Sequence, residues 1–241
     1  MANLLIDIGN TAVKVSLTEG TELGKTFRYQ GENVNKFIIS LAEKENPEVM
    51  VISSVYNISN TDEKIFSQKC GTLLILDNAH NSILERYGLP SYLSYDRAAS
   101  LIAARHLFKW TGCTVVDFGT TLTIDFIDSD GKYIGGNISL GLQTRLKAIN
   151  RYSKTLPLIQ MPDETRLIGT TLHESISSGI VSGIMFEIEG YLQLYPDNVV
   201  VFTGGDANYF VKKMKNSIFA TCNLVFIGLA LIAEEYVNNQ N

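Results

Sequence analysis

Residues 4–17, LLIDIGNTAVKVSL, contain the pattern that decides the fold. An apolar run ends at Asp7, a short polar stretch with Gly9 follows, and apolar and polar residues then alternate as far as Leu17. Alternation with a period of two is typical of a strand that buries one face. The stretch therefore predicts a β-hairpin with polar residues at its tip.

The same pattern returns near the middle of the 241-residue chain, at residues 115–126, VVDFGTTLTIDF. Asp117 here takes the place of Asp7, and a third extended stretch follows each hairpin. A repeat separated by nearly half the chain indicates duplicated domains rather than a short solenoid repeat. We place the boundary near Gly112, so that domains of residues 1–111 and 112–241 enclose a ligand cleft.

Strand and helix patterns alternate after each hairpin, which is the order of an α/β fold. The longest helix is expected at 170–193, with Leu172 at the start of its apolar stripe, and it is a reasonable subunit interface. Further helices are expected at 33–45, 61–69, 98–104, around 142–149 and at 224–237. Further strands are expected at 49–54, 73–76, 133–138 and 199–203.

Composition excludes several classes of protein. Hydrophobic residues make up 45% and charged residues 19%, which predicts a folded globular chain. A net charge of −5 argues against a sequence-independent nucleic-acid binder. The sequence shows no uninterrupted apolar membrane span and no basic leader, so we expect a cytoplasmic protein without a membrane partner. The three cysteines and three histidines are scattered and predict neither a disulfide framework nor a zinc site.

The two loops have residues suited to phosphate chemistry. Asp7 at a strand end can bind hydrated Mg²⁺, Gly9 permits close approach of a phosphate, and Lys14 adds a donor. A single such hairpin is better explained by ordinary turn geometry. Two of them across a cleft would hold a nucleotide polyphosphate from both sides, so the recurrence favours phosphoryl transfer.

Asp96 and Arg97 come just before an apolar helix. Asp96 is either a helix cap or a general base that accepts the proton of an alcohol. Arg97 would hold an acidic substrate or the transferring phosphoryl group. Both interpretations of Asp96 stay open on residue type alone.

The chain resembles the type III pantothenate kinases, which belong to the superfamily of acetate and sugar kinases, Hsp70 and actin. The resemblance runs along nearly the whole chain. Its motifs are Asp7–Thr11 with Lys14, Asp117–Thr121 with Thr123 and Asp125, Gly135–Ile138 with Gly141, Thr203–Ala207, and Ser94–Arg97 preceded by Tyr87.

The resemblance implies an α/β fold of two tandem ribonuclease H-like (actin-like ATPase) domains with a cleft between them. It implies phosphorylation of the primary hydroxyl of pantothenate to 4'-phosphopantothenate with ATP, the first step of coenzyme A biosynthesis. Asp96 would be the catalytic base. Asp7 would hold Mg²⁺ through the phosphates, and Asp117 the monovalent cation, K⁺ or NH₄⁺. Homodimers with substrate sites near the subunit interface are implied as well.

The resemblance also implies which residues contact the ligands. Those for the nucleotide are Asp7, Ile8, Gly9, Asn10, Thr11, Ala12, Val13, Lys14 and Thr120. Those for pantothenate are Tyr87, Ser94, Tyr95, Asp96, Arg97 and Thr171. Two positions depart from the family pattern, because Ser94 replaces a glycine and Leu172 aligns with the usual substrate-contacting threonine, for which Thr171 is the substitute.

Two alternatives remain beside this reading. The paired loops specify nucleotide or polyphosphate chemistry better than they specify the acceptor, so another kinase or a phosphatase of the same superfamily would also carry them. A regulatory protein that retains the fold is the non-enzymatic alternative. The sequence offers it little support, because all three candidate carboxylates are present and no basic helix is appended.

Overall fold

The structure is a computed structural model, and it describes residues 2–80 and 82–239. The described residues form two compact units. Unit 1 combines the chain up to Leu107 with the segment from Asn223 onward, and unit 2 is Phe108–Cys222.

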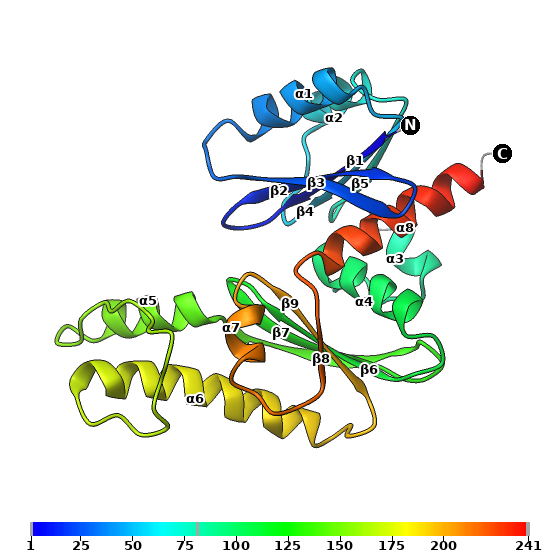
Figure 1. The fold of residues 1–241 in the computed structure, drawn as a ribbon. Coiled ribbons are helices and arrows are strands. Elements are labelled where there is room, and N and C mark those ends of the chain that lie inside the picture. Colours follow the sequence, from blue (N-terminus) through cyan, green and yellow to red (C-terminus); the bar gives the residue numbers. More distant parts are fainter. Residues whose placement is uncertain (1, 81, 240–241) are drawn as a thin grey trace. The chain divides into compact units, whose positions relative to one another are not determined.

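Unit 1 is a sheet covered by helices on both faces (Figure 1). Its strand order is β3-β2-β1-β4-β5, with the first three strands antiparallel and β1, β4 and β5 parallel. The strands are β1 (Ala2–Ile8), β2 (Val13–Glu19), β3 (Glu22–Tyr29), β4 (Val49–Ser54) and β5 (Thr72–Leu76). The helices are α1 (Val34–Glu45), α2 (Asn60–Ser67), α3 (Ser82–Arg86), α4 (Tyr95–Leu107) and α8 (Leu224–Asn238).

Unit 2 repeats this sheet. Its order, β8-β7-β6-β9-β10, is the order of unit 1 when it is read from the antiparallel edge, with the same strand directions. The strands are β6 (Cys113–Phe118), β7 (Thr121–Ile127), β8 (Tyr133–Leu140), β9 (Val199–Gly204) and β10 (Ile218–Ala220). The helices are α5 (Leu142–Tyr152), α6 (Leu172–Leu192) and α7 (Ala207–Val211). The duplication predicted from the two hairpins is confirmed.

Alternating residues of the central strands sort onto the two faces of the unit 1 sheet. Leu4, Ile6 and Ile8 belong to the core beneath α1 and α2. Leu5 and Asp7 therefore point to the opposite face, where α4 and α8 contact the sheet. The strand period thus places Asp7 on the same side of the sheet as the helix that carries Asp96.

The C-terminal helix α8 groups with unit 1, although the sequence-based boundary put it in the second domain. Its buried side chains, such as Leu229, pack with α4, β1 and β4. Gly228 lies so close to α4 that a Cβ there would stand 2.8 Å from the Cα of Ala99. Apolar burial, rather than position along the chain, decides which unit a helix joins.

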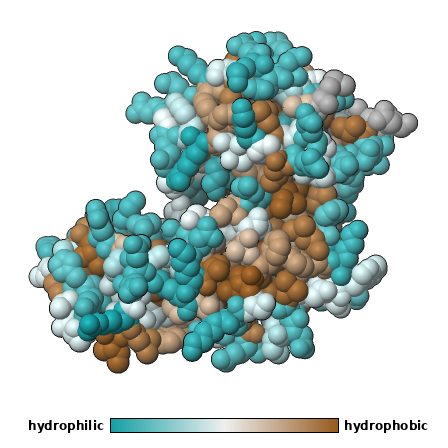
Figure 2. All heavy atoms as spheres, viewed as in Figure 1, coloured by the Kyte–Doolittle hydropathy of each residue, from teal (hydrophilic) through white to brown (hydrophobic). Residues whose placement is uncertain are grey.

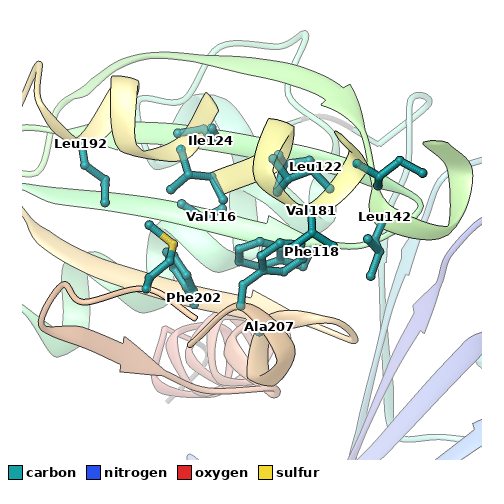
Figure 3. Packing of buried hydrophobic residues seen from close by; sticks show 14 of the residues in the cluster. Val116, Phe118, Leu122, Ile124, Leu142, Val181, Leu192, Phe202 and Ala207 are labelled. Carbon is teal, nitrogen blue, oxygen red and sulfur yellow. The ribbon is translucent and has the colours of Figure 1, made fainter. Parts of the chain in front are cut away.

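The core of unit 2 holds the second loop in place. Phe118, the last residue of β6, packs with its ring centroid 4.8 Å from that of Phe202 (Figure 3). The ring centroid of Phe210 lies 4.8 Å from it as well. The apolar stripe predicted for the long helix is buried from Ile176 onward. Leu172 is an exception and is 51% exposed, because it is the first residue of α6 and lies outside that core. No helix in the described part of the chain is long and apolar enough to cross a membrane.

Candidate active site

The first phosphate loop is a closed turn between β1 and β2. The backbone N–H of Gly9 donates to the carbonyl of Ala12, with an N···O distance of 3.1 Å. Asp7 is buried and pairs with Lys14 on β2 and with Ser53 on β4. Residues paired across strands point to the same face. The carboxylate of Asp7 therefore has a lysine and a serine as cross-strand neighbours, and this arrangement suits the binding of phosphates and a metal ion.

The second loop is a similar closed turn between β6 and β7, shorter by one residue in the strand register. The Gly119 N–H donates to the carbonyl of Thr121 over 3.1 Å, as Gly9 does in the first loop. Asp117 pairs with Thr123 and Thr203, at the positions that correspond to Lys14 and Ser53 in unit 1. The two aspartates therefore occupy equivalent places in the two sheets.

Gly204 allows the backbone to approach Asp117. It has φ +94°, and a Cβ there would overlap Oδ1 of Asp117 and stand 2.6 Å from the backbone N of Phe118. The following residues return to the same strand, because the N–H of Asp206 donates to the carbonyl of Phe118 over 3.2 Å. Within the Thr203–Ala207 signature, Gly204 and the Asp206 N–H thus pack the chain against the second loop. Burial raises the pKa of the Asp206 carboxyl above its usual value.

Thr120 is held by the start of α5. Its carbonyl accepts hydrogen bonds from the Gly141 N–H (3.1 Å) and from the Thr144 hydroxyl (2.6 Å). A Cβ at Gly141 would stand 2.9 Å from this same carbonyl oxygen. The glycine that ends the Gly135–Gly141 signature therefore lets α5 begin directly against the loop, while the side chain of Thr120 stays exposed.

Asp96 lies in the first turn of α4, and it is not the cap. The carbonyl of Ser94 accepts the first helical hydrogen bond, from Ala98 N, so Ser94 is the N-cap residue. One carboxylate oxygen of Asp96 accepts from the N–H of Arg97 over 2.8 Å, and Asp96 is half-buried. The cap interpretation of Asp96 is therefore wrong, while the base interpretation stays a prediction. Ser94 has a negative φ, so replacing the family glycine creates no backbone strain here.

Asp77 is a buried carboxylate that the sequence analysis did not single out. It follows β5, and because β1, β4 and β5 are parallel it lies at the edge of the sheet where β1 ends at Ile8. Its side chain accepts from Ile58 N (2.7 Å) and Ala79 N (2.9 Å), and its Oδ1 lies 2.7 Å from His80 Nδ1. A lone aspartate directly after an apolar strand was the only available signal.

These contacts affect ionisation at the edge of the unit 1 sheet. Burial opposes the charge of Asp77, but hydrogen bonds from Ile58, His80 and Ala79 hold its pKa below the usual value. Burial and then the negative charge of Asp77 raise the pKa of Tyr95, the residue before Asp96. Asp77 thus interacts electrostatically with the first residue of α4.

Tyr87 is held near the far end of α4. Its hydroxyl donates to the carboxylate of Glu235 on α8, and its carbonyl accepts from the Arg105 guanidinium over 2.8 Å. Arg105 lies nine residues beyond Asp96, which is ~13 Å along a helix. The structure therefore brings Tyr87 to α8, while Ser94, Tyr95, Asp96 and Arg97 gather at the first turn of α4.

Thr171 belongs to unit 2 and caps α6. Its hydroxyl accepts from Glu174 N over 3.2 Å, while Glu174 Oε2 accepts from Thr170 N (2.8 Å) and Thr170 Oγ1 (2.6 Å). This is a reciprocal arrangement close to a capping box, and the hydrogen bonds from Thr170 lower the pKa of Glu174. A cavity of about 620 Å³ lies beside this helix start, and its lining includes Arg166, His173 and Glu174.

Neither loop is a metal site built from protein ligands alone. Within residues 2–80 and 82–239, no three histidine, cysteine or acidic side chains are placed to hold a metal ion together. Mg²⁺ in phosphoryl-transfer sites is bound by one or two carboxylates together with the substrate phosphates. Asp7 is a hard oxygen ligand at a glycine turn, and this donor set fits such a divalent ion.

Comparisons with known proteins agree with the motifs. Residues 3–194 match the model of a family described as type III pantothenate kinase. A type III pantothenate kinase of Flavobacterium johnsoniae is 30% identical over 98% of this chain and 99% of its own length. One from Phocaeicola vulgatus is 34% identical over 94% of this chain and 96% of its own length.

Solved structures share the fold. A Campylobacter jejuni protein described as a Baf family transcriptional activator has a TM-score of 0.67 at 22% identity, covering 98% of this chain and 99% of its own. The pSK41 ParM protein has a TM-score of 0.56 at 13% identity, covering 99% and 98%. At these identities the likeness shows the fold alone, and both sheets here agree with the predicted pair of ribonuclease H-like domains.

Proposed function

The chain belongs to the type III pantothenate kinase family, and we propose that it transfers the γ-phosphoryl group of ATP to the primary hydroxyl of pantothenate. The product is 4'-phosphopantothenate, and the reaction is the first step of coenzyme A biosynthesis. The observation that best supports this proposal is that Asp7 and Asp117 occupy equivalent places in two sheets of the same topology. Asp96 and Arg97 lie in the first turn of α4.

Asp96 is the proposed general base. A carboxylate placed at the acceptor hydroxyl takes its proton as the phosphoryl group moves, which contributes roughly 10²–10⁴-fold to the rate. The hydrogen bond from Arg97 N fixes the side chain, and the helix N-terminus stabilises the negative charge of an acidic residue in the first turn. Arg97 is buried next to it, where its permanent positive charge would offset negative charge on the acceptor or on the phosphoryl group.

The two loops are the proposed nucleotide contacts. The Gly9 N–H closes its own turn, so we assign the phosphate contacts to the segment from Asn10 to Val13 and to Lys14, which lies across the strands from Asp7. On the second loop, we propose Thr120 as the residue that contacts the nucleotide. A divalent ion bound by Asp7 and the phosphates would neutralise charge that builds on the transferring group. We further propose that Asp117 binds a monovalent cation, K⁺ or NH₄⁺.

We propose that pantothenate, the acceptor, is contacted by Tyr87, Ser94, Tyr95 and Thr171. Ser94 and Tyr95 lie directly before the proposed base, which supports their assignment. Tyr87 is held by Glu235 at the opposite end of α4.

We also propose that the enzyme is a cytoplasmic homodimer that acts without nucleic acid or membrane. Figure 2 shows hydrophobic residues at the molecular surface. The exposed apolar residues of unit 2 include Ile138 and Leu140 on edge strand β8 and Phe186 on α6. An unpaired edge strand and exposed apolar side chains are features that a second subunit can cover. Sedimentation of the purified chain tests the proposal, and a monomer at all micromolar concentrations would contradict it.

The test of the reaction is a coupled assay of ADP release with pantothenate, glycerol, acetate and glucose as acceptors. We expect turnover with pantothenate well above the other acceptors, and mass spectrometry should find one phosphate on the product. Turnover equal to the control without acceptor would reject the function. Preference for a sugar or acetate would favour another kinase of the superfamily, whereas nucleotide binding without any turnover would favour a regulatory protein.

A further inference from the structure

Tyr87 is fixed at both its side chain and its backbone. The phenol donates its only hydroxyl hydrogen to the Glu235 carboxylate, and its carbonyl accepts from Arg105. Burial and then this hydrogen bond raise the pKa of the phenol above its usual value, so the hydroxyl stays protonated near neutral pH. The orientation of the ring is therefore determined by residues on α4 and α8.

Glu235 is a second contact point for the same short segment. Its other carboxylate oxygen lies 3.5 Å from the guanidinium of Arg86, the residue before Tyr87. Both oxygens of one carboxylate therefore hold consecutive residues at the end of α3. Glu235 also lies beyond residues 3–194, the segment that matches the family model. The family motifs discussed above do not include it.

Tyr87 lines two cavities of unit 1. One, of about 440 Å³, is bordered by Ile102 and Arg105 on α4 and by Leu231 and Glu235 on α8. The other, of about 290 Å³, lies towards β5 and α3. Because Tyr87 borders two cavities, the hydrogen bond to the Glu235 carboxylate, in addition to packing, determines where the phenol lies.

We infer that Glu235 is a positioning residue for Tyr87, and that α8 thereby contributes to recognition of the acceptor. The inference rests on the proposed function, in which Tyr87 contacts pantothenate. It also fixes the direction of that contact. Because the phenol hydrogen is donated to Glu235, the phenol oxygen has only lone pairs to offer a ligand. The matching group on the acceptor is then a donor, either the amide N–H or a hydroxyl, and not the carboxylate.

Steady-state kinetics of the purified full chain test the inference. Glu235→Ala removes the group that holds the phenol hydrogen and orients the ring. We therefore expect the KM for pantothenate to rise about tenfold, which corresponds to the net free energy of roughly one hydrogen bond. The KM for ATP should stay within about twofold of wild type. Glu235→Gln keeps an oxygen that accepts from the phenol and should recover most of the loss. Glu234→Ala removes the neighbouring carboxylate of α8 and should match wild type.

A double-mutant cycle separates positioning from a general effect on stability. Tyr87→Phe alone should raise the KM for pantothenate as much as Glu235→Ala, and the double variant should be no worse than Tyr87→Phe. Arg86→Ala removes only the ion pair with Glu235 and should change the KM for pantothenate little.

Additive effects in the double variant, or a Glu235→Ala enzyme with wild-type KM, would overturn the inference while the function stands. If Glu235→Ala does not fold, Glu235→Gln behaving worse than Tyr87→Phe would overturn it too. A wild-type chain inactive on pantothenate rejects the function, and the inference fails with it.

Discussion

Gly204 lies directly against the carboxylate of Asp117, and the contact leaves no room for a side chain. The strand β9 runs parallel to β6, and its last residue pairs with Phe118, so the backbone of Gly204 passes beside the second loop. Its φ of +94° is one that residues with a Cβ rarely adopt. Close approach and backbone conformation both require glycine at this position.

Gly204→Ala should therefore destabilise unit 2. Backbone strain and overlap with the Phe118 backbone each cost about 1–3 kcal/mol, and the two costs act together. We expect a fall in Tm of several degrees, measured by calorimetry, and weaker ATP binding. Gly205→Ala is the matched control, because a Cβ at 205 would meet nothing within 4 Å. Equal melting temperatures for the two variants would contradict the packing argument.

The sequence predicted the elements around this loop well because the period of apolar residues is a local property. The helix expected at 33–45 and the strand expected at 49–54 are observed at Val34–Glu45 and Val49–Ser54. The three-residue strand β10 was missed, since a stretch of three residues shows no period. The packing of α8 on α4 depends on contacts between distant segments, which local pattern does not encode.

In the candidate site, too, residues that belong to a sequence pattern could be predicted, whereas contacts between distant segments could not. Asp7 and Asp117 were found because their motif recurs, and Asp96 because a charged pair precedes an apolar helix. Asp77 and Glu235 carry no motif, and their importance comes from the groups that folding brings to them. Thr171 and Tyr87 were identified by resemblance, but their hydrogen bonds to Glu174 and Glu235 could be learned only from the structure.

Asp96→Asn tests the proposed base. The amide keeps a carbonyl oxygen for the Arg97 N–H but no longer accepts a proton, so kcat should fall roughly 10²–10⁴-fold. The Kd for ATP, measured by calorimetry, should be unchanged. Glu63→Gln, in the first turn of α2, controls for the loss of a charge near a helix N-terminus and should leave kcat unchanged. Near-normal turnover of Asp96→Asn would remove Asp96 as the base.

The lowered pKa of the Asp77 carboxyl predicts a specific dependence of stability on pH. Its folded-state pKa lies below the unfolded value of 3.8, so its contribution is complete above pH 3.8 and is lost as the pH falls through the folded pKa. In Asp77→Asn, the free energy of unfolding should be lower at pH 7 by about 1–3 kcal/mol, because one buried acceptor is replaced by a donor. Its decline below pH 4 should be shallower than in wild type.

Urea unfolding at pH 7, 5, 4 and 3 measures this difference. Asp130→Asn, in the exposed turn between β7 and β8, should parallel wild type across the series. If Asp77→Asn and wild type lose stability equally between pH 4 and 3, the hydrogen bonds from Ile58, Ala79 and His80 do not hold the carboxylate in its charged form.

Asp117→Asn tests the proposed monovalent cation site. A carboxylate binds K⁺ or NH₄⁺ mainly through its charge, which asparagine lacks, whereas the shape that fits against Gly204 is kept. Wild-type turnover should rise when K⁺ replaces tetramethylammonium at constant ionic strength, and the variant should not respond. A variant with the wild-type response to K⁺ would place the cation elsewhere.

Thr171 has an observed structural role and a proposed functional one, and two substitutions separate them. Thr171→Ala removes the hydroxyl oxygen that accepts from the Glu174 N–H and should cost about 1 kcal/mol of stability, as loss of an N-cap does. Thr171→Ser keeps the hydroxyl and should melt like wild type. If the hydroxyl also contacts pantothenate, the KM for pantothenate should rise in the alanine variant and return in the serine variant, at a temperature well below both transitions. A lower Tm without any change in KM would limit Thr171 to capping α6, and the search for the acceptor contact would then move to Arg166 and His173 in the neighbouring cavity.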